Sequence, residues 1–214
     1  MRKTIFLTFL LLTITLLSSC AQRGYTPQAG DLLFQIAGPS EGSQAIADAT
    51  AWDDAEKFSH VAILALDESG DPYVLEATGD RGVTRTEWAD FVEKSVSING
   101  KPGIVVKRVN VDFPVDKAFE RIQAHYGEPY DWSYYPDNGK MYCSELVYEC
   151  FRKTDGTPLF TAHPMNFRDG NGNMPAFWIE VFEKLGEPIP EGVLGTNPQD
   201  MSKDPVLVEV HRYF

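Results

Sequence analysis

The stretch SHVAILALDESGDPYVLEA, residues 59–77, predicts the fold class of this chain. Two runs rich in β-branched and large apolar residues, Ser59–Leu66 and Pro72–Ala77, flank the acidic sequence DESGD at 67–71. This pattern is typical of two antiparallel strands joined by a tight turn. We therefore expect a hairpin here, and with it an antiparallel sheet.

Further elements extend outward from this hairpin, and they alternate strands with helices in an order that favours an α+β fold over a doubly wound parallel sheet. No internal repeat or long linker interrupts the chain, so we expect a single domain over residues 30–214. The other expected strands are Asp31–Ile36, Ile104–Val109 and Pro205–Val210. The expected helices are Val115–Tyr126, a helix from Cys143 or Ser144 to Lys153, one from Asn173 to Gly186, and the weaker candidates Ser43–Lys57 and Glu87–Val92.

The composition excludes several classes of protein. The chain has 214 residues, 43% of them hydrophobic and 12% aromatic, which is enough for an ordinary core and argues against disorder. The formal net charge is −12, so we expect no nucleic-acid partner. Three cysteines are too few for a disulfide scaffold.

The N-terminus, MRKTIFLTFLLLTITLLSSC, has the features of an export signal. Its apolar run, Ile5–Leu17, rises only about 20 Å as a helix, whereas the hydrocarbon core measures about 30 Å. The ending LSSC at 17–20 resembles the bacterial lipobox, in which the cysteine is lipidated and becomes the new N-terminus. We expect a signal peptide at 1–19, a lipidated Cys20 with a short tether at 20–29, and an exported bacterial lipoprotein anchored to the cell envelope. An ordinary signal peptide with a chance cysteine is the alternative.

Once Cys20 is set aside, two thiols remain. Cys143 and Cys150 are seven positions apart on one expected helix, about 10 Å, which is too far for a disulfide. Cys150 shares a face with Leu146 and Val147 and is expected in the core. Cys143 opens the helix, where free N–H groups and the helix dipole stabilise a thiolate. It is either a nucleophile or a small buried hydrophobe.

A thiolate nucleophile needs an acid/base partner, and the chain has four histidines. His60 opens an apolar strand and is a candidate, although a structural histidine fits there equally well. His125 is expected to interact with charge at the end of its helix, His163 is an outside candidate, and His211 is expected on the surface. No two histidines have the spacing of metal ligands, so we expect no metal site.

The hairpin offers a third polar residue. If its turn centres on Ser69, residues whose numbers sum to 138 face each other, so Ala62 opposes Glu76. His60 and Glu76 then share one face of the sheet as a diagonal pair. A register shifted by one residue would place them on opposite faces and make Glu76 a solvated strand charge.

Four blocks in fixed order resemble a known family: GDLLF at 30–34, SHVAI at 59–63, VLEA at 74–77 and YCSELV at 142–147. They resemble the circularly permuted papain-like hydrolases of the YiiX/YebB type, relatives of the NlpC-type cell-wall peptidases. In the unpermuted enzymes the cysteine helix precedes the histidine strand; here the histidine comes first, as the permuted group requires. Shorter blocks, GEPYD, PMNF and GTNP, extend the resemblance over most of the domain. Ala62 departs mildly from the group, where glycine is common.

The resemblance implies a papain-like α+β fold in permuted order, with an antiparallel sheet or barrel packed against helices. It implies that Cys143 is the nucleophile, that His60 is the general base and then acid, and that Glu76 orients His60. The main-chain N–H of Cys143 would form half of an oxyanion hole, with Tyr130 as the second donor. Such chemistry passes through a thioester and requires no cofactor.

The substrate stays open at this level, because a shared fold does not transfer specificity. The first interpretation is a membrane-tethered amidase or peptidase acting on cell-wall peptide or acyl-amide material. The second is a lipid acyl hydrolase or acyltransferase, and the third is a non-catalytic lipoprotein that binds lipid or peptide. The loop at 161–173 is long enough for a lid or site wall. Aromatic residues near the site line an acyl pocket or belong to the core: Trp132, Tyr134, Tyr135, Phe160, Phe167 and Trp178.

Overall fold

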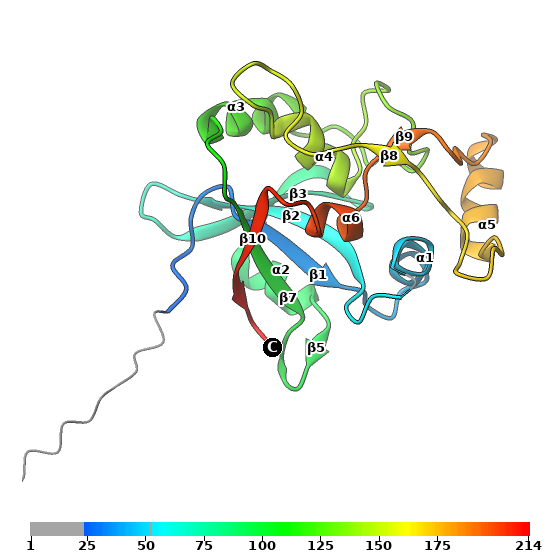
Figure 1. Cartoon of the computed structure of the whole chain (residues 1–214), viewed down its shortest axis with the longest axis horizontal. Helices are drawn as coiled ribbons and strands as arrows, with labels where there is room; N and C mark the ends of the chain where they lie inside the picture. The colour runs from blue at the N-terminus through cyan, green and yellow to red at the C-terminus, as the bar shows by residue number, and fades with distance from the viewer. Residues whose placement is uncertain (1–23, 52) are drawn as a thin grey trace, which may run out of the picture.

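A six-stranded antiparallel sheet forms the centre of the computed structural model, which describes residues 24–51 and 53–214 (Figure 1). The strand order is β10-β7-β1-β2-β3-β4, so β1 to β4 follow one another in the chain, while β7 and β10 join the sheet beside β1 from later parts of the chain. The strands are β1 (Leu32–Ile36), β2 (Phe58–Leu66), β3 (Pro72–Thr78), β4 (Gly82–Glu87), β7 (Ile104–Val109) and β10 (Leu207–Arg212). Two further antiparallel pairs are the hairpin of β5 (Ser97–Ile98) with β6 (Lys101–Pro102), and β8 (His163–Pro164) with β9 (Leu194–Gly195), which are far apart in the chain.

Helices cover both faces of this sheet. On one face, Leu146 and Val147 of α4 (Cys143–Cys150) and Ile122 of α3 (Val115–His125) pack on alternate residues of the central strands. On the other face, Phe91 of α2 (Trp88–Lys94) packs on residues such as Leu33. Figure 1 shows α3 and α4 on the opposite side of the sheet from α2. The strands therefore carry apolar residues on both faces, as their near-continuous apolar sequences require.

A third cluster lies beside the sheet. α1 (Glu41–Thr50) and α5 (Ala176–Leu185) lie next to each other, and α6 (Pro198–Ser202) contacts α1 and β2 (Figure 1). Aromatic rings from α5, from the segment before α4 and from the segment 161–173 fill this region: Tyr134, Tyr142, Phe167, Trp178 and Phe182. These rings meet mostly edge to face, the arrangement that aromatic quadrupoles favour.

The predicted hairpin register is confirmed. Ile63 pairs with Leu75 and Leu64 with Val74, so paired residue numbers sum to 138. The α+β fold class and the antiparallel sheet are confirmed as well.

Several predicted boundaries are wrong. The helix at 143–153 ends at Cys150, because residues 151–153 turn back and pair with 157–159. The weaker helix predicted at 43–57 is shorter, and runs over α1 only. The strand predicted at 205–210 lies two residues later, and β4 was not predicted at all.

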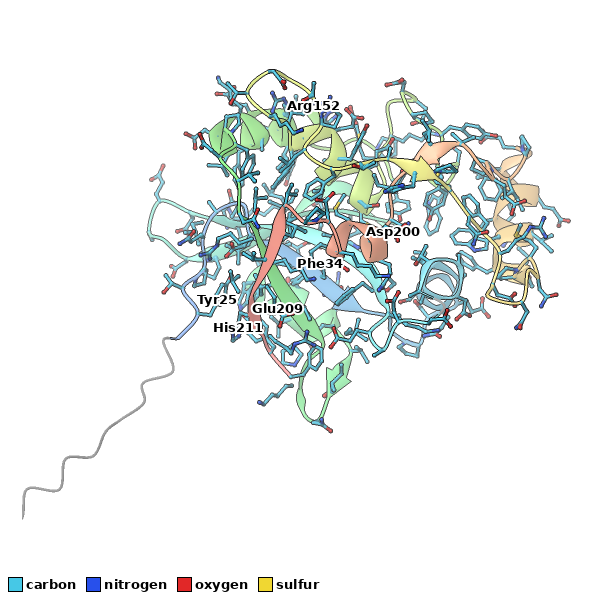
Figure 2. All side chains as sticks on the ribbon, in the orientation of Figure 1. Tyr25, Phe34, Arg152, Asp200, Glu209 and His211 are labelled. Atoms are coloured by element: carbon cyan, nitrogen blue, oxygen red, sulfur yellow. The ribbon has the colours of Figure 1, made fainter. Side chains whose placement is uncertain are left out.

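The first described residues pack against the domain. Asp31 is buried and accepts hydrogen bonds from Tyr25 Oη at 2.7 Å and from the Gln28 N–H at 3.0 Å. Arg108 donates to both Asp31 oxygens, at 2.6 and 2.8 Å. The Tyr25 ring stacks on His211 with centroids 4.8 Å apart, and Figure 2 shows the two side chains together. His211 thus lies within β10 and is half-buried, which corrects the expectation of a surface residue.

The proposed signal peptide and Cys20 lie outside the described residues, while the last part of the expected tether, 24–29, is docked as just described. Among the residues that the structure describes, no helix is both long and apolar enough to cross a membrane.

Candidate active site

Cys143 is the first residue of α4 and is 4% exposed. Glu145, in the same turn, accepts a hydrogen bond from the Tyr142 N–H at 3.3 Å, which helps to start the helix at this position. N–H groups in a first helical turn have no partner within the helix, so the N–H of Cys143 is available to an oxyanion. Cys150 is fully buried in the core, as predicted, and both thiols are free.

The hairpin brings His60 and Glu76 together. His60 Nε2 lies 2.7 Å from Glu76 Oε2, and the Glu76 side chain is 4% exposed. Since Nε2 is engaged by Glu76, Nδ1 is the nitrogen left for the thiol. The diagonal pairing predicted from the register is therefore present.

The electrostatics of this pair favour a charged ring. Burial alone would lower the pKa of His60, but hydrogen bonding and charge from Cys143 and Glu76 outweigh burial and raise the pKa to about 10. Burial would raise the pKa of Glu76, whereas His60, Thr86 and Arg81 hold it below its usual value. The raised pKa of His60 and the lowered pKa of Glu76 both correspond to an imidazolium next to a carboxylate at neutral pH.

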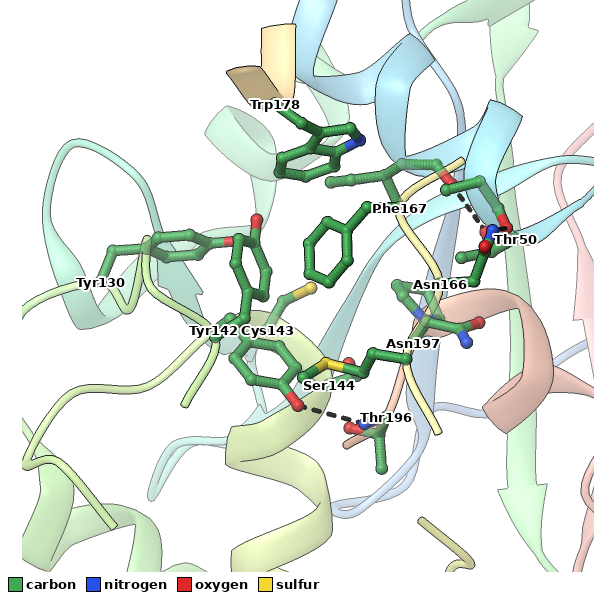
Figure 3. Close-up of a pocket in the computed structure, with 15 residues that line it drawn as sticks. Thr50, Tyr130, Tyr142, Cys143, Ser144, Asn166, Phe167, Trp178, Thr196 and Asn197 are labelled. Carbon is green, nitrogen blue, oxygen red and sulfur yellow. Dashed lines mark hydrogen bonds between the residues drawn. The ribbon is translucent and has the colours of Figure 1, made fainter. Parts of the chain in front are cut away.

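Two cavities meet at these residues. The first, the aromatic pocket, has about 470 Å³ of empty space and is lined by Cys143 with Tyr130, Tyr134, Tyr142, Phe167 and Trp178, among others. Figure 3 shows the Cys143 sulfur pointing toward the ring of Phe167. The second, the polar cleft, has about 1290 Å³ and is lined by His60 and Glu76 with Ser43, Ser59, Asp80 and Lys94, among others. Tyr130 and Tyr134 line both cavities.

Of the aromatic residues predicted to line a pocket or to belong to the core, some line the cavities and others do not. Tyr134, Phe167 and Trp178 line the aromatic pocket, and Trp132 lines the polar cleft. Phe160 belongs to the core beneath the sheet, and Tyr135 lines neither cavity. The segment 161–173 supplies Met165, Asn166 and Phe167 to the aromatic pocket, so it forms a wall of the site.

Tyr130, predicted as an oxyanion donor, borders both cavities. Burial, together with the neighbouring Tyr134 and Cys143, raises the pKa of Tyr130 well above its usual value, so the phenol keeps its proton and can donate it in a hydrogen bond.

The other histidines lie elsewhere. His125 Nδ1 lies 3.0 Å from Glu128 at the end of α3, which agrees with its predicted role, and His163 is exposed on β8. Within residues 24–51 and 53–214, no group of three or more His, Cys, Asp or Glu side chains has a geometry that could hold a metal ion.

Thr86 and Arg81 contact Glu76 and were missed by sequence reasoning. Thr86 lies on β4, a strand that the sequence did not predict. Without that strand, the sequence does not indicate which face of the sheet Thr86 occupies. The register of β2 with β3 alone does not identify Thr86 as a neighbour of Glu76. That also requires the register of β3 with β4.

Comparison with known proteins places this arrangement in a family. Residues 26–211 match the family described as permuted papain-like amidase enzyme, YaeF/YiiX, C92 family. The chain belongs to the C92 family. It is 30% identical over 204 residues to a protein of Escherichia coli (strain K12) described as uncharacterized protein YiiX, and the match covers 94% of each chain. The resemblance to the YiiX type and the permuted papain-like fold are thus confirmed.

A solved C92 relative has the same fold. The crystal structure described as that of metalloprotein yiiX from Escherichia coli O157:H7 superimposes with a TM-score of 0.70 at 28% identity, covering 88% of this chain and 98% of that one. The described residues of the present chain do not offer the side-chain cluster that a metal centre needs.

Proposed function

We propose that this C92 chain is a membrane-tethered cysteine amidase that cleaves an amide bond through a thioester on Cys143. The observation that carries the proposal is the division of the site: Cys143 lines only the aromatic pocket, and His60 and Glu76 line only the polar cleft. A nucleophile keeps the acyl part of its substrate, whereas the general acid protonates the leaving group. The acyl part therefore occupies the aromatic pocket and the leaving amine occupies the polar cleft.

In the first half-reaction, the Cys143 thiolate attacks the carbonyl carbon and forms a C–S bond, and the carbonyl π electrons move to oxygen. The N–H of Cys143 and the phenol of Tyr130 stabilise this oxyanion. As the oxyanion collapses, the C–N bond breaks, and the protonated His60 donates its proton to the departing nitrogen. Glu76 keeps the ring oriented throughout.

In the second half-reaction, water attacks the thioester. His60 accepts a proton from the water, the C–S bond breaks, and a carboxylic acid leaves the aromatic pocket. Cys143 and His60 return to their starting state, so the chain's own residues complete the cycle.

The lining of the aromatic pocket favours a peptide-like acyl group. Ser144 Oγ and Trp178 Nε1 are buried there and lack a hydrogen-bond partner among the described residues. Both atoms are already out of contact with solvent, so a hydrocarbon chain adds nothing to their cost, whereas a peptide carbonyl that reaches either donor gains a hydrogen bond of about 0.5–1.5 kcal/mol. The abundance of aromatic rings in the same pocket is the observation that favours the second candidate, a lipid acyl hydrolase or acyltransferase.

The first test is the pH dependence of Cys143 alkylation by iodoacetamide. We expect fast alkylation below about pH 7 that is lost in His60→Ala, because the imidazolium stabilises the thiolate. Cys143 and Cys150 lie on one tryptic peptide, between Lys140 and Arg152, so tandem mass spectrometry reads both thiols and makes Cys150 the internal control. Alkylation that rises only near about pH 8.5, as for a free thiol, would instead indicate a binding protein.

The substrate class is tested with aminomethylcoumarin amides that share one leaving amine and differ in the acyl group. We expect kcat/KM for a short peptidyl group to exceed that for a palmitoyl group by at least about tenfold, and Cys143→Ala to be inactive with both. A preference for palmitoyl would support the second candidate function.

A further inference from the structure

The two carboxylate oxygens of Glu76 have different partners. Oε2 faces His60 Nε2, while Oε1 accepts a hydrogen bond from Thr86 Oγ1 at 2.5 Å. Thr86 is 2% exposed, so its hydroxyl is not shared with solvent. The carboxylate is thus held from the side opposite to His60.

Arg81 determines the direction of the Thr86 hydroxyl. Arg81 Nη2 donates to Thr86 Oγ1 at 2.8 Å and lies 3.6 Å from Glu76 Oε1. A guanidinium only donates hydrogen bonds, so it occupies an acceptor position of the hydroxyl, and the single hydroxyl proton is free to point at Glu76. Oε1 then accepts a hydrogen bond and carries no proton itself.

The strand pairing shows how Thr86, and not its neighbour Thr84, lines up with His60 and Glu76. Thr84 is directly opposite Glu76 on β4, and Thr86 is opposite Val74. His60, Glu76 and Thr86 therefore lie on one diagonal across β2, β3 and β4, and Arg81 reaches this line from the turn between β3 and β4.

We propose that Thr86 and Arg81 are positioning residues of this site, which hold Glu76 as a carboxylate so that the proton between Glu76 and His60 stays on the imidazole. The proposal rests on the proposed function, because the imidazolium is the acid that protonates the leaving amine in the proposed amidase. Thr86 and Arg81 act through Glu76 and contact neither the nucleophile nor the leaving group.

The test compares Thr86→Val, Thr86→Ser and the matched control Thr84→Val in the full-length chain in mild detergent. Thr84 is two residues away on the same strand, and its hydroxyl bonds to the Arg85 carbonyl. We expect Thr86→Val to lower the titration midpoint of His60 by about one pH unit, because the carboxylate that stabilises the imidazolium loses its second hydrogen bond. The midpoint is read by ¹⁵N NMR of the imidazole, assigned by its absence in His60→Ala. Thr86→Ser keeps the hydroxyl and is expected to restore the midpoint to within about 0.3 pH units, and Thr84→Val is expected to leave it unchanged.

A second variant keeps the test decisive if Thr86→Val does not fold. Arg81→Gln, compared with Arg85→Gln on the exposed part of β4, is expected to lower the His60 midpoint in the same direction by a smaller amount. A folded Thr86→Val chain with an unchanged His60 midpoint, or an equal effect of Thr84→Val, would overturn the proposal. If wild-type Cys143 proves unreactive, the proposed function fails, while the His60 midpoints still report on Thr86 and Arg81.

Discussion

At the scale of single residues, Glu145 carries an unusual charge state next to the nucleophile. Burial, aided by the charge of Asp131, raises the pKa of its carboxyl to about 8 against the opposing hydrogen bond from the Tyr142 N–H. In the unfolded chain this carboxyl ionises near its ordinary value of 4.5, whereas the folded chain retains the proton up to about pH 8. The free energy of unfolding therefore decreases as the pH rises through this window. A neutral Glu145 places no negative charge beside the Cys143 thiolate.

Glu145→Gln keeps a carbonyl acceptor for the Tyr142 N–H and removes the titration. We expect wild type to lose stability relative to Glu145→Gln by on the order of 2–4 kcal/mol between about pH 5 and about pH 8. Urea unfolding at several pH values measures this difference. Glu149→Gln, at a partly exposed carboxylate paired with Arg152, is the matched control. A wild-type-to-Glu145→Gln difference that is constant with pH would contradict the buried neutral state.

At the scale of elements, β4 depends on a glycine that permits close backbone contact. Gly82 has a φ of +64°, and a Cβ at this position would lie 2.0 Å from the Glu128 carbonyl oxygen. The neighbouring Val83 bonds to the segment that leads to Tyr130, donating to Glu128 O and accepting from the Gly127 N–H, both at 2.9 Å. The turn therefore fixes one wall of the active site as well as β4.

Gly82→Ala is expected to cost about 3 kcal/mol or more, because backbone strain adds to a clash with a backbone atom. Gly70→Ala is the matched control: Gly70 also has a positive φ, but nothing lies within 4 Å of its Cβ position. We expect Gly70→Ala to cost only about 1 kcal/mol. Chemical denaturation of both variants measures the difference, and equal costs would show that the Glu128 contact contributes nothing.

The same elements show what the sequence could predict. β2 and β3 were predictable because their apolar content and turn are local, and the register followed from the turn and placed His60 beside Glu76. β4 was not predictable, because GVTRTE has little apolar content, and the hydrogen-bond partners of the buried Thr86 hydroxyl, Glu76 and Arg81, are polar. For the same reason Thr86 and Arg81 were missed. The sequence also could not distinguish pocket aromatics from core aromatics. Phe160 and Phe167 are equally buried, and only the tertiary structure places one in the core beneath the sheet and the other in the aromatic pocket.

At the scale of the whole molecule, Arg108 connects the N-terminal segment to the sheet. It pairs with Asp31, whose side chain is fully buried, and also donates to the Thr26 carbonyl. Arg108→Met leaves the Asp31 carboxylate buried without its charge partner, and we expect a loss of about 3 kcal/mol. Arg85→Met removes an exposed pair with Glu87 and is expected to cost less than about 1 kcal/mol. Thermal and urea unfolding distinguish the two, and a negligible effect of Arg108→Met would rule out the pair as an anchor.

In the lipoprotein that we propose, the docked N-terminal segment also limits the distance between the domain and its lipid anchor. Tyr25 is five positions after Cys20, so at most about 17 Å of chain separates the lipid from a fixed point on the domain. The segment enters the sheet at the Leu64 end of β2, since the Gly30 N–H bonds to Leu64 O, while His60 lies toward the other end, about 13 Å along the strand. Figure 1 places the first described residues and α1 on opposite sides of the molecule. If Cys20 carries the proposed lipid, the tether leaves the domain on the side opposite α1, which lines the polar cleft, and the cleft then opens on the side away from the anchor.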